Sequence, residues 1–280
     1  MPLAEIGDLI TPAATRGRGV GAFNVIQLEH AEAIVTGAER VGAPVVLQIS
    51  ENTVAFHRGL LAPIGRACLA IAEAATVPVA VHLDHATRED LVHEAVRLGI
   101  RSVMYDASAL TYEENVAATA AIVRWCGDYG AWLEAELGEV GGKDGVHAPG
   151  ARTDPDDAAR YVSYTKVQAL AVAVGSSHAM LTRDAVLDID LIRKIHATVP
   201  VPLVLHGSSG VPDAGMTEAV SAGMTKINIA THLNKALTAA VREKLDADTA
   251  LVDPRKYLGP GRDAIADQVA HLLGVLRAVE

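Results

Sequence analysis

The stretch Val79-Ala80-Val81-His82-Leu83-Asp84-His85 decides the fold and also points to where the chemistry lies. Its first half is a short apolar run of the kind that forms a strand buried on both faces of a parallel sheet. Its end carries two histidines and an aspartate, and burying such groups without partners costs about 1–3 kcal/mol each. We therefore expect a core strand whose carboxyl end carries functional side chains.

Seven other short apolar runs alternate with segments whose apolar residues recur at helical spacing. Together with Val79–Leu83, the predicted strands are Val20–Asn24, Val45–Ile49, Ser102–Tyr105, Trp132–Leu137, Ala169–Val174, Leu203–Leu205 and Lys226–Ile229. Helices are predicted over segments such as Gln27–Arg40, Arg88–Leu98 and Thr111–Trp125. The spacing of Thr111 and Glu114 is that of a capping box, and Asp154-Pro155 suits the start of a helix.

This alternation predicts an α/β protein with a (β/α)8 TIM barrel, since eight strand–helix units in about 250 residues are typical of that fold. We expect one domain over residues 1–280, with an N-terminal helix and a C-terminal helical extension. A doubly wound open sheet is the alternative, but no G-x-G-x-x-G motif follows the first predicted strand.

The composition argues against several classes of protein. Of the 280 residues, 50% are hydrophobic and 21% are charged, which is typical of a globular chain. The net charge of −10 argues against a nucleic-acid partner, and no apolar run approaches the ~20 residues of a membrane span. The N-terminus lacks the pattern of a signal peptide, and Cys68 and Cys126 do not make a disulfide framework. We therefore expect a cytoplasmic protein without nucleic-acid or membrane partners.

A polar or ionisable residue stands at or just after the carboxyl end of every predicted strand, at the rim where the active site of a barrel lies. They are Asn24, Ser50, Asp84 with His85, Asp106, Glu136, Ser177 with His178, His206, and Asn228. Ordinary turn chemistry explains Asn24 and Ser50, but it explains three histidines poorly. Three neutral imidazoles that converge on one rim suit a catalytic Zn²⁺ with an open position. His82 is left open, either as an outer partner of that site or as a core histidine.

Two loops near the same rim predict a phosphate site. Gly207-Ser208-Ser209-Gly210 follows the seventh predicted strand, and Asn228-Ile229-Ala230-Thr231 leads from the eighth strand into a helix. In barrels of this kind the loops after strands seven and eight frequently bind phosphate. Small residues let backbone N–H groups approach the oxygens, hydroxyl groups add donors, and a helix N-terminus favours an anion.

Taken together, these residues resemble the class II, metal-dependent ketose-bisphosphate aldolases of the fructose- and tagatose-bisphosphate aldolase group. The resemblance runs nearly end to end. The motifs that carry it are Gly21–Asn24, His82–His85, Ser102–Asp106, Glu134–Gly138, Gly141-Gly142, His206–Gly210, Lys226–Thr231 and Asp253–Lys256.

The resemblance implies an enzyme of carbohydrate metabolism. It would cleave a ketose (bis)phosphate of the fructose- or tagatose-1,6-bisphosphate type reversibly to dihydroxyacetone phosphate and an aldehyde. His85, His178 and His206 would bind Zn²⁺, which stabilises the enediolate as a Lewis acid. Asp84 would move the proton of the hydroxyl at the reacting bond. Asp106 and Glu136 match positions at or beside the metal, including an alternative metal position.

The resemblance also implies the residues that hold the substrate. Gly207, Ser209, Asn228 and Thr231 would hold the ketose-phosphate end, often with a monovalent cation, Na⁺ or K⁺, nearby. The rim and the two loops add Asn24, Ser50, Ser208 and Ala230 to the expected substrate-binding set. Arg255 matches an arginine that can meet the distal phosphate, in some members across a subunit interface. A homodimer or homotetramer is therefore expected.

Three departures from the family pattern bear on the substrate. Ala86 and Ala179 stand where glycine commonly follows the zinc histidines. The glycine-rich loop Gly138–Thr153 lacks a glutamate that handles the carbon-bound proton, for which Asp144 or Glu139 are candidate substitutes. Two alternatives therefore stay open: an aldolase for a singly phosphorylated substrate, and a non-catalytic sugar-phosphate-binding partner subunit. Lys226 is expected to open its strand at the end away from the site, so no Schiff-base lysine is foreseen.

Overall fold

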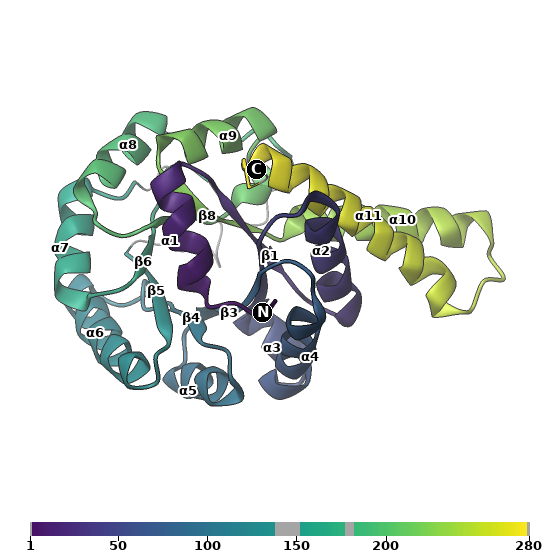
Figure 1. The fold of residues 1–280 in the computed structure, drawn as a ribbon, viewed down its shortest axis with the longest axis horizontal. Helices are drawn as coiled ribbons and strands as arrows, with labels where there is room; N and C mark the ends of the chain where they lie inside the picture. Colours follow the sequence, from purple (N-terminus) through teal and green to yellow (C-terminus); the bar gives the residue numbers. More distant parts are fainter. Residues whose placement is uncertain (1, 138–151, 177–181, 279–280) are drawn as a thin grey trace.

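A computed structural model describes residues 2–137, 152–176 and 182–278 of the chain. Its centre is a closed barrel of parallel strands in chain order, β1 to β8, ringed by helices (Figure 1). The barrel closes where β8 pairs with β1, in the register Val20↔Lys226 and Ala22↔Asn228. The predicted (β/α)8 barrel is confirmed, and the open sheet that was its alternative is wrong.

The strands lie close to their predicted positions. Their bounds are β1 Val20–Asn24, β2 Val45–Ser50, β3 Val79–Ala86, β4 Ser102–Tyr105, β5 Trp132–Glu136, β6 Ala169–Ala171, β7 Leu203–Leu205 and β8 Met224–Ile229. The largest differences are in β3, which was predicted to end at Leu83 and runs to Ala86, and in β6, which was predicted to run to Val174. β6 stops earlier, and the carbonyls of Ala173 and Val174 accept hydrogen bonds from the N–H groups of Thr153 and Asp188 instead.

The helices cover the outside of the barrel and one of its ends. Their bounds are α1 Ile6–Arg16, α2 Leu28–Val41, α3 Glu51–Phe56, α4 Leu61–Ala74, α5 Glu89–Leu98, α6 Tyr112–Asp128, α7 Pro155–Thr165, α8 Ile189–Thr198, α9 Asp213–Ala222, α10 Thr231–Ala247 and α11 Pro254–Val275. A 3-10 turn, η1, spans Ser208–Gly210. Thr111 and Glu114 form the predicted capping box, and Asp154 accepts bonds at the start of α7.

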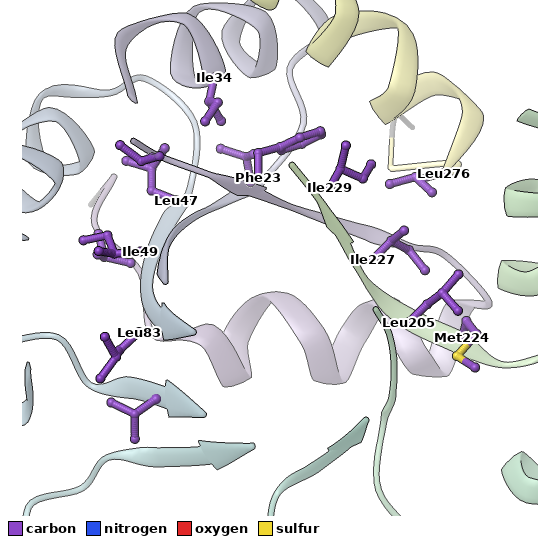
Figure 2. Close-up of a cluster of buried hydrophobic side chains, with 14 of the residues drawn as sticks. Phe23, Ile34, Leu47, Ile49, Leu83, Leu205, Met224, Ile227, Ile229 and Leu276 are labelled. Carbon is purple, nitrogen blue, oxygen red and sulfur yellow. The ribbon is translucent and has the colours of Figure 1, made fainter. Parts of the chain in front are cut away.

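Two clusters of the core show the alternation of the strands. Outward-facing residues such as Phe23, Leu47 and Leu83 belong, with Ile34 of α2, to one buried apolar layer between strands and helices (Figure 2). Fully burying one such side chain stabilises the fold by about 1.5–3 kcal/mol. Inward-facing residues at the N-terminal end of the barrel pack against α1. This second cluster comprises Val20, Ala22, Val46 and Ala80 with Ile6, Leu9 and Ile10 of α1.

The last two helices form a hairpin that extends beyond the barrel (Figure 1). The two helices pack closely at Gly261, where a Cβ atom would lie 2.5 Å from Cδ1 of Leu237. The turn between α10 and α11 lies at the far end of this arm. Among the helices that the structure describes, none has the length and apolar character needed to cross a membrane.

Candidate functional site

The end of β3 presents two consecutive residues, Asp84 and His85, to the same point. Consecutive residues of a regular strand face opposite sides of the sheet. Here the pairing register shifts between Leu83 and Ala86, and His85 has a left-handed φ of 49°. This backbone conformation costs a non-glycine residue about 1–3 kcal/mol, and such strain collects at functional sites. The bulge lets both side chains contribute to one cluster.

Residues from the ends of four strands meet around His85. Asp84, His85 and His206 each offer a ligand atom, and these atoms lie within 4.8 Å of one another. His85, Asp106 and Glu136 form a second such group. The structure thus brings together five residues that the sequence singled out, from β3, from β5 and from the positions directly after β4 and β7.

The distances within this cluster are short. Nδ1 of His85 lies 2.8 Å from Oδ2 of Asp106 and 4.0 Å from Oε2 of Glu136. Nδ1 of His206 lies 3.3 Å from the same Glu136 oxygen, and the two imidazole rings stand edge to face with centroids 4.6 Å apart. Imidazole nitrogens with carboxylate oxygens are a donor set that suits Zn²⁺. The described residues therefore fit a zinc ion.

Two side-chain amides flank the carboxylate of Asp84. Nδ2 of Asn24 lies 3.4 Å from Oδ2, and Nδ2 of Asn228 lies 3.4 Å from Oδ1. Gln48 donates in turn to Oδ1 of Asn24 at 3.0 Å. Burial alone would raise the pKa of Asp84, but the positive charges of His85 and other neighbours outweigh it and lower that pKa. The carboxylate is thus kept ionised and able to accept a proton.

A buried charged layer lies beneath the cluster, on the side toward α1. Nζ of Lys226 lies 2.8 Å from Oε2 of Glu134, and Oε1 of Glu134 lies 3.2 Å from Nε2 of His206. His82 contacts Oγ of Ser102 at 2.7 Å and Nζ of Lys226 at 3.5 Å. The prediction that Lys226 opens its strand is wrong, because β8 begins at Met224 and the lysine side chain is buried among these residues.

The two buried histidines of this region have opposite pKa shifts. Burial, together with the charge of Lys226, lowers the pKa of His82 to about 3. Burial would also lower the pKa of His206, but hydrogen bonds to Glu134 and Glu136 outweigh it and raise that pKa to about 9. His82 is therefore neutral near pH 7, and His206 carries a proton when no metal is bound.

The loop after β7 meets the start of α10, as the phosphate-site prediction requires. Oγ of Ser209 accepts bonds from the N–H groups of Ala230 at 3.2 Å and His232 at 3.4 Å. Gly207 has a left-handed φ of 66° at the start of this loop. The hydroxyl of Ser208 donates to the carbonyl of Leu205 at 3.1 Å and serves the turn itself. Thr231 is the first residue of α10, whose N-terminus favours an anion.

Several predicted site residues have other contacts or cannot be placed. Ser50 lies on the rim opposite Asp84, but its hydroxyl accepts a bond from the N–H of Thr53 and caps α3. Arg255 lies at the start of α11, at the end of the projecting arm, where its side chain is 89% exposed and pairs with Asp253 at 2.9 Å. The structure does not bring it together with the cluster around His85. His178, Glu139, Asp144 and Ala179 lie outside the described residues.

Three residues around the site were missed in the sequence analysis. Gln48 and Glu134 were not assigned roles, and Lys226 was set aside. A period of two along each strand would have found them. Gln48 precedes Ser50 by two residues, Glu134 precedes Glu136, and Lys226 precedes Asn228. Each lies one inward-facing position below a rim residue.

Comparisons with known proteins agree with this geometry. The family described as Fructose-bisphosphate aldolase class-II matches residues 4–280. A probable fructose-bisphosphate aldolase of Bacillus subtilis (strain 168) is 39% identical over 272 residues, which cover 96% of this chain and 95% of that protein. The fructose-bisphosphate aldolase of Staphylococcus aureus (strain Mu50 / ATCC 700699) is 37% identical with the same coverage.

Solved structures give the same result. The YdjI aldolase of Escherichia coli K12 superposes with a TM-score of 0.85 at 31% identity, over 98% of this chain and 97% of that chain. A putative fructose-1,6-biphosphate aldolase of Coccidioides immitis superposes with a TM-score of 0.86 at 26% identity, over 97% and 96%.

Proposed function

The chain belongs to the class-II fructose-bisphosphate aldolase family and is an aldolase, a carbon–carbon lyase, and we propose that it acts on a ketose (bis)phosphate of the fructose- or tagatose-1,6-bisphosphate type. The products are dihydroxyacetone phosphate and an aldehyde. One observation carries the proposal: Asp84, His85 and His206 converge within 4.8 Å at the rim where the Ser209 loop meets the start of α10.

Zn²⁺ is the metal that the donor set favours, and when bound it supplies Lewis-acid chemistry toward the substrate oxygens. His85 and His206 would hold it, and His178 is the proposed third ligand. Asp106 orients His85 through the 2.8 Å contact with Nδ1. Glu136 is proposed to serve an alternative metal position, which its contacts with both histidines support.

Asp84 is the proposed proton carrier. Its ionised carboxylate accepts the proton of the hydroxyl on the carbon that becomes the aldehyde, and returns it in the condensation direction. The amides of Asn24 and Asn228 hold the carboxylate in place and stay available to substrate oxygens. Asp144 or Glu139 is the proposed group for the carbon-bound proton.

The phosphate of the ketose end is proposed to bind the loops after β7 and β8. Oγ of Ser209 accepts bonds from two N–H groups at the start of α10, and its own O–H is a donor that an anion there can use. Gly207, Ser208, Asn228, Ala230 and Thr231 complete this set, with Ser50 on the neighbouring rim and a monovalent cation, Na⁺ or K⁺, beside the phosphate.

Arg255 is proposed to meet the distal phosphate in a second copy of the chain. Its place on the projecting arm, away from the cluster around His85, supports a homodimer or homotetramer in which one protomer completes its partner's site. We propose that the protein is located in the cytoplasm.

A substrate panel on zinc-loaded protein tests the proposal. Zinc-dependent release of dihydroxyacetone phosphate from fructose- or tagatose-1,6-bisphosphate is expected, with loss of activity in EDTA and no trapping of substrate by borohydride. Cleavage of ketose monophosphates alone would favour the singly phosphorylated alternative, which Ala179 supports. If metal-replete protein cleaves none of them, the proposed function fails. Substoichiometric zinc would then favour a non-catalytic partner subunit.

A further inference from the structure

The strongest feature outside the proposed machinery is the ion pair between Lys226 and Glu134 inside the barrel. Both side chains are buried, at 1% and 0% exposure, and their charged atoms lie 2.8 Å apart. Glu134 uses its other oxygen, Oε1, to contact Nε2 of His206 at 3.2 Å. The two oxygens of one carboxylate therefore link a fixed cation to a proposed metal ligand.

The contacts on the two ring nitrogens of His206 differ. Nε2 faces Glu134, away from the cluster, whereas Nδ1 faces Glu136 at 3.3 Å, within the cluster. Both ring nitrogens face a carboxylate, which accepts hydrogen bonds and donates none. The shorter contact, 3.2 Å with the geometry of a hydrogen bond, is that of Nε2 with Glu134, so a neutral His206 carries its proton on Nε2. Nδ1 is then the nitrogen with a lone pair, on the side of the proposed metal.

Glu134 is itself held by its surroundings. Lys226 comes from β8, Glu134 from β5, and His206 directly follows β7, so the contacts link three separate parts of the barrel wall. His82 of β3, which contacts Ser102, lies 3.5 Å from the Lys226 ammonium on another side. The ammonium thus has defined neighbours and keeps Glu134 in one orientation.

We propose that Glu134, fixed by Lys226, is a positioning residue that selects the tautomer and orientation of His206. This inference rests on the proposed zinc site but adds residues that do not ligate the metal. Partners of this kind typically contribute 10–100-fold to metal affinity.

The competing explanation is that the ion pair only stabilises the fold. Buried ion pairs are weak stabilisers, and replacing both partners by apolar residues of similar volume is often neutral or stabilising by about 1–4 kcal/mol. A double substitution therefore separates the two roles. It removes the hydrogen-bond acceptor of His206 without leaving an unpaired charge in the barrel.

The test compares E134L/K226M with E134Q/K226M. E134L/K226M removes the oxygen of residue 134 that Nε2 of His206 contacts, and E134Q/K226M keeps a neutral amide oxygen at the same place. Gly37→Ala serves as the stability control, because its Cβ would lie 2.6 Å from the carbonyl of Ala266 in the outer layer, away from this network. The measurements are zinc affinity by competition with a chelating dye, urea unfolding, and ¹⁵N NMR of the histidine rings at about pH 10 in metal-free protein, above the His206 pKa of about 9.

The expected result is zinc binding about 10–100-fold weaker in E134L/K226M than in wild type, at equal or greater unfolding stability. E134Q/K226M should recover most of that loss, and Gly37→Ala should lose stability but keep zinc affinity. The NMR spectrum should show protonated Nε2 in wild type and a mixture of tautomers in E134L/K226M.

Wild-type affinity and a single tautomer in E134L/K226M would overturn the proposal. So would an equal loss in E134L/K226M and E134Q/K226M, since the amide would then rescue nothing. If wild-type protein binds no zinc, the proposed function fails. In that case the tautomer of His206 in metal-free protein still decides the positioning role.

Discussion

Raising the pH is expected to lower the unfolding free energy of the metal-free protein through the side chain of His206. In the folded chain its hydrogen bonds to Glu134 and Glu136 overcome the effect of burial and raise its pKa to about 9. An unfolded histidine titrates near 6.5. Because folding raises the pKa, the folded state holds this proton more tightly than the unfolded state does. The resulting stabilisation is complete below about pH 6.5 and is lost as the pH rises through about 9.

The size of the effect follows from the two pKa values. One pKa unit corresponds to about 1.4 kcal/mol, so the span from about 6.5 to about 9 corresponds to roughly 3 kcal/mol of unfolding free energy. The other buried histidine, His82, affects stability over a different pH range. Its pKa is lowered to about 3 by burial and by Lys226, so its effect falls between about pH 3 and 6.5, where acidification destabilises the fold.

Urea unfolding of EDTA-treated protein, followed by circular dichroism between about pH 6 and 9.5, measures this contribution. The matched control is His206→Gln, which keeps an amide of similar reach but does not titrate. The difference in unfolding free energy between the two proteins should shrink by about 3 kcal/mol across this range. Other groups that titrate here affect both proteins and cancel.

Zinc binding should have the opposite pH dependence to the stability of the metal-free protein. A ligand nitrogen must lose its proton to bind metal, so zinc affinity is expected to rise up to tenfold per pH unit until about pH 9. Calorimetry in buffers of different ionisation enthalpy should then detect about one proton released from His206 per zinc bound at pH 7. Parallel pH slopes for wild type and His206→Gln, in the metal-free state, would refute the reasoning.

Three other substitutions test separate parts of the structure. Asp84→Asn should keep stoichiometric zinc while turnover falls by about 10²–10⁴-fold, and normal turnover would remove Asp84 from its proposed role. Ser209→Ala removes a hydroxyl donor at the proposed phosphate site together with the contact that holds the start of α10, so KM for the phosphorylated substrate should rise more than kcat falls; an unchanged KM contradicts this. Gly37→Ala places a Cβ 2.6 Å from the carbonyl of Ala266 and should lower the unfolding free energy by about 1–3 kcal/mol, whereas a melting temperature at or above wild type would show that α2 and α11 adjust freely.

The barrel could be predicted because its strands are local features. A run such as Leu203–Leu205 is apolar on both faces and bounded by turns, and its ends were predicted correctly. Errors arose where distant groups set the end of a strand. β6 ends at Ala171, and the carbonyls of Ala173 and Val174 beyond it accept hydrogen bonds from Thr153 and Asp188. Neither donor is near β6 in the sequence.

The site could be predicted only as far as the rim. Strand ends of a parallel barrel share one edge, so Asp84, His85 and His206 were expected to meet, and the structure brings them together. The ion pair of Lys226 and Glu134 depends on which residues of β5 and β8 lie level across the barrel. That alignment is set by the closure of the whole sheet and cannot be deduced from either strand alone.

Along the stretch Val79–His85, the inward-facing side chains are graded from apolar at the N-terminal end of the barrel to ionisable at the rim. Its inward-facing residues are Ala80, His82 and Asp84, and each enters a different environment. Ala80 packs in the apolar cluster against α1, His82 lies in the charged layer with Lys226, and Asp84 reaches the cluster at the rim. The paired strand β2 follows the same order, since Val46, Gln48 and Ser50 lie opposite these three residues.

This grading explains why a barrel filled with charge at its middle can still be stable. The apolar layer and α1 close the N-terminal end, so the charged layer is desolvated, and there an unpaired ion would cost several kcal/mol. Each charge is therefore paired: Lys226 with Glu134, and Glu134 with His206. A one-residue shift in β3 would bring Val81, Leu83 and His85 inward instead, and would put apolar side chains where His82 and Asp84 now lie. The bulge at His85 comes only after the last of them, where it adds an imidazole to the rim without disturbing the layers below.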